Sequence, residues 1–232
     1  MAGLAVHLII ARELHKLLPE GTILNLGQFY AGSIAPDAVH ARVNYARSDK
    51  KRTHLREDIP DKDFINEPFL SLFRQRVAEY ILQHRDGEDG LLDVHRGYVV
   101  HLLTDELYLL TLRQEFVISM EKLGITQSDK EFFLRVITDM NRNDFLLLYH
   151  DREMEEIRYQ LEQVEPFAVE PMLSEAEVSD SRSWVINRFF YEEYELQEPV
   201  TISFQRTKEF VRMAAEDIKS RLSEGGSLPR MF

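Results

Sequence analysis

His101 and Asp105 are the two residues whose types and spacing point most directly to chemistry. They lie four residues apart in a stretch with helical periodicity, so they share one helix face and are close enough to bind one cation. Their neighbours from Gly97 to Tyr108 are nearly all apolar, which predicts that both side chains are buried. A buried carboxylate is costly, so either a metal ion or a hydrogen-bonded His–Asp pair must compensate for it.

Three further residues offer donors of the kinds that zinc accepts. His7 lies between Val6 and Leu8 in an apolar helical stretch, and Asp37 and His54 lie in a long segment without clear periodicity. The chain has no cysteine, so only His, Asp and Glu side chains can ligate a hard or borderline metal. The candidate metal ligands are therefore His7, Asp37, His54, His101 and Asp105.

A cationic cluster occupies the same segment and contains only Asp49 as an acid. Such a cluster can hold an anionic substrate in an otherwise acidic chain, and a solvated loop can have the same composition. Arg52 and Arg56 are the candidate substrate-binding residues, and His40, three residues after Asp37, is a candidate contact for a phosphate. The cationic cluster consists of Arg42, Arg47, Lys50, Lys51, Arg52 and Arg56.

The elements that must position these residues are helices. Helical periodicity recurs along the chain and strand alternation is almost absent, which predicts an all-α fold. With 232 residues, of which 44% are hydrophobic and 29% charged, we expect a single-domain multi-helix bundle. The metal-binding domain should span residues 1–222, with a flexible C-terminal tail over 223–232. Helices are predicted over 4–18, 67–84, 91–123, 128–148, 151–164, 174–194 and 203–222, and residues 22–65 are expected to be mostly irregular.

Charge and hydropathy restrict the partners and the location. The 40 acidic and 28 basic residues give a net charge of −12, which argues against binding to duplex nucleic acid. The longest apolar runs fall short of the roughly 18–20 residues needed to span a bilayer, so no transmembrane segment is predicted. The apolar N-terminal run has no basic residue ahead of it, so we interpret it as a structural helix and not as a signal peptide. This interpretation predicts a cytoplasmic location.

The candidate ligands fall within motifs whose order and spacing are informative together. The motifs are Val6-His7-Leu8-Ile9-Ile10-Ala11, Gly32-Ser33-Ile34-Ala35-Pro36-Asp37, Lys51-Arg52-Thr53-His54-Leu55 and Gly97-Tyr98-Val99-Val100-His101-Leu102-Leu103-Thr104-Asp105. Over roughly residues 1–110 this arrangement resembles the zinc-dependent phospholipase C family. It is more distantly similar to the fungal zinc nucleases specific for single strands.

The resemblance implies an all-α bundle with a zinc centre. It makes Asp37, His54, His101 and Asp105 the ligands of one ion. It also implies that Asp105 bridges toward a second ion at His7 and that Asp37 is a candidate general base. Zinc lowers the pKa of a bound water to about 7 and polarises a phosphoryl oxygen, so hydroxide can attack at neutral pH.

The chain departs from the fuller zinc constellation of that family. The only histidine after Asp105 is His150, whose i+4 neighbour is Met154, so no His and acid pair one helical turn apart follows. Secreted members also use an N-terminal tryptophan, whereas the only tryptophan here is Trp184. These departures favour one or two zinc ions.

Two functional hypotheses follow. The first is a metal-dependent phosphoric-ester hydrolase, a phospholipase C-like phosphodiesterase, that uses zinc-activated water on a small-molecule or lipid phosphoester. The alternative is a family member without catalysis, in which a metal or a His–Asp network holds the helices together and the acidic surface binds a protein partner. A structural zinc site has four protein ligands, whereas a catalytic one leaves a position for water.

Overall fold

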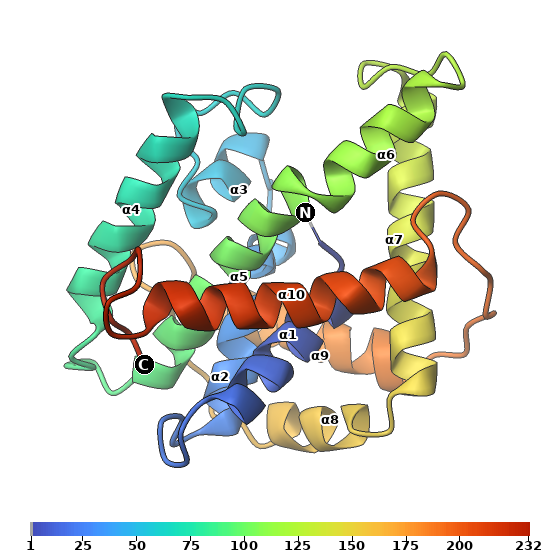
Figure 1. Ribbon diagram of the computed structural model, residues 1–232. Coiled ribbons are helices and arrows are strands. Elements are labelled where there is room, and N and C mark those ends of the chain that lie inside the picture. The colour runs from blue at the N-terminus through green and yellow to red at the C-terminus, as the bar shows by residue number, and fades with distance from the viewer. Residues whose placement is uncertain (1) are drawn as a thin grey trace.

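A computed structural model describes residues 2–232, and Met1 lies outside the described residues (Figure 1). Helices contain 64% of the chain, and no β-strand occurs within residues 2–232. The prediction of an all-α fold is confirmed, and the helices form one compact domain. No helix of the described chain is long and apolar enough to cross a membrane.

The helices are named in chain order. They are α1 (Leu4–Leu17), α2 (Leu26–Ile34), a 3₁₀ helix (Ala35–Ala41), α3 (Arg47–Thr53), α4 (Phe69–His84), α5 (Leu92–Leu110), α6 (Leu112–Glu121), α7 (Lys130–His150), α8 (Met154–Glu162), α9 (Glu175–Ile186), a π-helical turn (Asn187–Tyr191) and α10 (Phe204–Leu222).

The prediction that residues 22–65 are mostly irregular is wrong, because α2, the 3₁₀ helix and α3 lie within them. Asn25 caps α2 by accepting a hydrogen bond from the backbone N–H of Gln28 at 3.0 Å. Gly32 and Gly97 let α2 pack closely on α5, since a Cβ on Gly97 would lie 2.1 Å from the carbonyl oxygen of Phe29. Glycines that resemble helix breaks in the sequence therefore serve a helix crossing.

One predicted helix is interrupted. The structure divides the helix expected over 91–123 at Thr111, whose backbone (φ −123°, ψ −91°) is not helical. The Thr111 hydroxyl donates to the carbonyl oxygen of Leu107 at 2.6 Å and thereby satisfies one carbonyl at the end of α5.

Helix α5 lies in the interior, with α10 and α1 crossing over it in Figure 1. Its residue Glu106 is fully buried and forms ion pairs with Arg74 of α4 at 2.6 Å and Arg221 of α10 at 2.8 Å. These two pairs fix the rotation of α5 at the residue next to Asp105.

The last ten residues, expected to be a flexible tail, return to the bundle. The backbone N–H of Met231 donates to the carbonyl oxygen of Leu222 at 3.1 Å, and Arg96 of α5 donates to the carbonyl oxygen of Met231 at 3.0 Å. The side chain of Met231 is buried. These contacts connect the end of the chain to α5, the helix that contains His101 and Asp105.

Candidate metal centre

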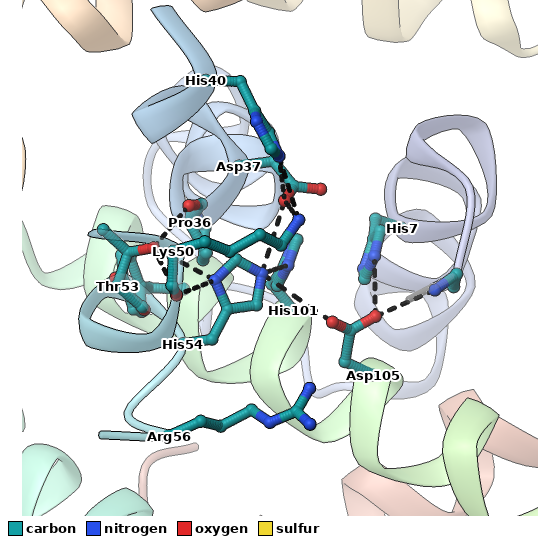
Figure 2. A network of polar contacts seen from close by, with 12 residues as sticks. His7, Pro36, Asp37, His40, Lys50, Thr53, His54, Arg56, His101 and Asp105 are labelled. Atoms are coloured by element: carbon teal, nitrogen blue, oxygen red, sulfur yellow. Dashed lines mark hydrogen bonds and ion pairs between the residues drawn. The ribbon is translucent and has the colours of Figure 1, made fainter. Parts of the chain in front are cut away.

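The five predicted ligands lie together in the interior, although they come from four elements (Figure 2). Helix α1 supplies His7, the 3₁₀ helix supplies Asp37, and His54 follows the last residue of α3. Helix α5 supplies His101 and Asp105, one helical turn apart. Their exposed fractions are 0% for His7, 8% for Asp37, 2% for His54, 0% for His101 and 4% for Asp105.

These residues form two groups that could each hold a metal ion. One group is His7, His101 and Asp105, and the other is Asp37, His54 and His101. Within each group the ligand atoms lie within 4.8 Å of one another, and His101 belongs to both. Asp105 also approaches the second group, since its Oδ2 lies 3.8 Å from His54 Nε2.

Backbone carbonyls set the protonation of two imidazoles. His101 Nδ1 lies 2.8 Å from the carbonyl oxygen of Ser33, and His54 Nδ1 lies 3.0 Å from that of Lys50. A carbonyl oxygen only accepts, so both Nδ1 atoms bear the proton and both Nε2 atoms are bare. The two Nε2 atoms lie 3.3 Å apart, so their lone pairs lie close together and no proton bridges them. A cation coordinated by both nitrogens would satisfy this arrangement.

The other half of the centre also has unsatisfied polar atoms. The His7 ring stacks on the His101 ring with centroids 3.8 Å apart, and His7 Nε2 lies 3.5 Å from Asp105 Oδ1. Neither His7 nitrogen has a hydrogen-bond partner among the described residues, and Asp105 Oδ2 has none either. An unpaired buried polar group costs about 1–3 kcal/mol, so a ligand at this position would stabilise the fold.

The electrostatics produce the protonation states that metal binding requires. Burial and the neighbouring His7 hold the pKa of His101 well below its usual value, and burial lowers the pKa of His54. Burial alone would raise the pKa of Asp37, but the charge of Lys50 outweighs this effect and keeps it well below the usual value. At neutral pH both imidazoles are therefore neutral, and Asp37 is ionised.

Lys50 belongs to the centre, although the sequence indicated only its membership of the cationic cluster. Its buried ammonium group donates to Asp37 Oδ1 and lies 3.1 Å from His40 Nε2. The half-exposed His40 ring lies 3.8 Å from Asp37 Oδ1, so it sits beside the candidate ligands. The available signal was the four-residue spacing of Lys50 and His54, which places both on one side of a helix.

The two predicted substrate-binding arginines differ in position. Arg56 is buried and directed toward the centre in Figure 2, with its guanidinium 4.2 Å from the centroid of the Phe64 ring. Burial lowers the pKa of Arg56 and the Asp105 carboxylate opposes this effect, so the two groups interact. Arg56 forms its ion pair with Asp61 at 3.2 Å, and Arg52 is exposed.

A cavity of about 650 Å³ adjoins the centre at Asp37 and His40. Its walls are mostly apolar and aromatic, with Phe145 of α7 and Trp184 of α9 among the lining residues. Arg188 adds a positive charge to the lining, and Asp37, Asp144 and Asp180 add carboxyl groups. The sequence did not indicate this cavity, because its walls come from segments more than 100 residues apart.

Asp144 of α7 is a further carboxylate of this cavity that the sequence did not indicate. It lies at the start of α1, and burial raises its pKa to about 7 although the nearby backbone N–H groups of Ala5, Val6 and Leu4 act to lower it. Asp144 therefore lies beside the N-terminus of the helix that supplies His7, where a negative charge is favoured. It belongs to neither group of candidate ligands.

Comparison of the chain with protein-family models, with curated proteins and with solved structures found no match. A fold alone does not define a function, so the functional argument depends on the geometry of the site. The structure defines an all-α protein with a buried His/Asp cluster that could hold a metal ion beside an apolar cavity.

Proposed function

We propose that this protein is a metal-dependent phosphoric-ester hydrolase of the kind found in the zinc-dependent phospholipase C family. The observation that supports it best is the pair of bare Nε2 atoms of His54 and His101, 3.3 Å apart and flanked by Asp37 and Asp105. Two neutral imidazoles and two carboxylates are a donor set that zinc prefers.

The proposed ligands of the first ion are Asp37, His54, His101 and Asp105, and Asp105 would bridge toward a second ion at His7. A catalytic role requires that the first ion also accept a water beside these protein ligands. When bound, zinc lowers the pKa of a coordinated water to about 7 and polarises a phosphoryl oxygen. Asp37 borders both the centre and the cavity and is the candidate general base, and Lys50 weakens it as a base by holding its pKa well below the usual value.

Positive charge beside the centre suits a phosphoester. The Lys50 ammonium group and the buried Arg56 guanidinium approach the centre from different sides, and both can stabilise phosphoryl oxygens. The cavity at Asp37 would hold the apolar part of the ester against Phe145 and Trp184. A phosphodiester with an apolar or lipid substituent therefore fits the site better than a fully polar one.

Metal content and hydrolysis of bis-nitrophenyl phosphate test the proposal. We expect at least about 0.5 equivalent of zinc in protein purified without chelators, and hydrolysis that stops on chelation and returns with zinc. His150→Ala is a control variant that should keep the zinc content and the activity of the wild type, because this exposed histidine at the end of α7 lies in neither ligand group. Protein that neither contains nor binds zinc would overturn the proposal.

The same experiment distinguishes the alternative of a protein without catalysis. A bound ion without detectable hydrolysis would favour a structural role, with the metal connecting α1, α3 and α5 and the acidic surface binding a protein partner. Burial of all five candidate ligands is compatible with this alternative, so activity decides between the two.

A further inference from the structure

A second cluster of metal-ligand side chains lies at the turn between α4 and α5, apart from the centre described above. It consists of His84, the last residue of α4, Asp89 in the turn, and His95 in the first turn of α5. One ligand atom from each lies within 4.8 Å of the others. We propose that His84, Asp89 and His95 bind a divalent ion of the zinc class that ties the ends of α4 and α5 together.

The orientation of His95 supports this site. Its Nε2 atom lies 2.7 Å from Asp89 Oδ2, while its Nδ1 atom lies 2.7 Å from the hydroxyl oxygen of Tyr80. Tyr80 is buried and holds the ring in place, as outer partners of metal-binding histidines do. A carboxylate oxygen only accepts, so in the metal-free protein His95 Nε2 donates its proton to Asp89, and Nδ1 accepts from the Tyr80 hydroxyl. A metal ion held by His95 and Asp89 would take the place of that proton and release it, and Nδ1 would then carry a proton and donate it to the Tyr80 oxygen.

His84 brings a second nitrogen to the same place. Its ring stacks on His95 with centroids 3.8 Å apart and planes 22° apart.

The surroundings allow an ion to enter from solvent. The side chain of Asp89 is 45% exposed, whereas that of His95 is buried, so the cluster extends from the interior to the surface. Three protein ligands leave at least one coordination position for water. Two nitrogens and one oxygen favour zinc, nickel or copper over calcium or magnesium, which prefer oxygen ligands.

The position in the fold indicates what the ion would do. Helix α5 begins at Leu92, immediately after the turn, and continues to His101 and Asp105. An ion held by both sides of the turn would fix the start of the helix that supplies the interior centre. The inference does not depend on the proposed hydrolase activity.

Zinc titration by calorimetry tests this site on protein stripped with a chelator. We expect His84→Ala and Asp89→Ala each to bind about one zinc equivalent fewer than the wild type, while His150→Ala binds the wild-type number. Asp89 is half exposed and lies in a turn, so its replacement should not disturb folding. Equal stoichiometry and affinity in all four proteins would overturn the proposal.

This titration separates the two metal proposals. A wild type that binds one ion, lost in Asp89→Ala, would retain the turn site and remove the support for the hydrolase. If Asp89→Ala instead binds as many ions as the wild type, the turn site is excluded and the interior centre of the proposed hydrolase is retained. Trypsin cleavage after the exposed Arg85 gives a local measurement: zinc should slow it at least about threefold in the wild type and not in Asp89→Ala. An unchanged rate in the wild type would contradict the tie between α4 and α5.

Discussion

Replacement of Asp105 with asparagine is the sharpest perturbation of the interior centre, because it removes a charge and changes the volume very little. The backbone N–H of Ala2 donates to Asp105 Oδ1 at 2.9 Å, and an asparagine carbonyl oxygen can accept the same bond. The main loss is the negative charge that faces His7 at 3.5 Å and His54 at 3.8 Å.

The expected effect on zinc affinity follows from that charge. Two unit charges about 4 Å apart interact by about 4 kcal/mol at an effective dielectric constant of about 20. A tenfold change in affinity corresponds to about 1.4 kcal/mol, so Asp105→Asn should weaken zinc binding at least on the order of a thousandfold. This is a lower bound, because zinc carries two charges and a coordinating oxygen lies closer than 4 Å. In metal-free protein the groups around Asp105, His7 and His101 among them, hold its pKa well below the usual value although burial alone would raise it. The ionised carboxylate therefore stabilises the fold without zinc as well, and its replacement should lower the free energy of unfolding there too.

Competition with a chelator of known affinity measures the first effect, and thermal unfolding with and without zinc measures the second. The stability difference between wild type and Asp105→Asn should be larger with zinc than without it, because zinc binding adds to the stabilisation by the carboxylate. Asp144→Asn is the matched control, since Asp144 is also a buried carboxylate near α1 but belongs to neither ligand group. An equal loss of stability with and without zinc would refute the argument and leave Asp105 as a structural residue.

Four further outcomes are expected. His54→Ala should reduce hydrolysis of bis-nitrophenyl phosphate at least about a hundredfold in steady-state assays, because it removes a bare nitrogen of the centre. Arg56→Ala should raise the KM for this substrate about tenfold and Arg52→Ala should not, since only Arg56 is directed toward the centre. Because the pKa of His101 is lowered in the folded state, the metal-free protein should be stable above pH 6.5 and lose up to about 1.4 kcal/mol per pH unit for this histidine as the pH falls below that value; an acid titration of unfolding measures it. Glu106→Gln should lower the free energy of unfolding by about 3–5 kcal/mol without changing zinc stoichiometry, because it leaves two arginines without their buried partner.

The residues of α1 and α5 could be identified in the sequence because each helix is apolar on nearly every side. A polar side chain such as His7 or His101 in that setting must be buried wherever the helix packs. The four-residue spacing of His101 and Asp105 then fixes their common direction. Helical periodicity alone therefore located three of the five candidate ligands, without knowledge of the neighbouring helices.

The packing of α2 could not be predicted in the same way. Gly32 and Gly97 are far apart in the chain, and each is small because the other helix passes within about 2 Å of the position that a Cβ would occupy. Nothing near either glycine in the sequence identifies its partner. The cavity has the same origin, since Asp37 and Trp184 meet only when α9 packs on the 3₁₀ helix.

The short helix α3 explains both differences in the assignment of basic residues. Once residues 47–53 are helical, positions four apart share a face, so Lys50 turns toward Asp37 together with His54. Arg52 is two positions from Lys50, a rotation of about 200° on a helix, and it faces solvent. Arg56 follows Leu55, whose φ of 54° reverses the chain, so helical periodicity no longer applies and only the folded turn brings the guanidinium back to the centre. Because this seven-residue helix was not predicted, the exposed Arg52 was assigned to the site in place of the buried Lys50. Arg56 was identified because it lies near His54 in the sequence, and not from its geometry.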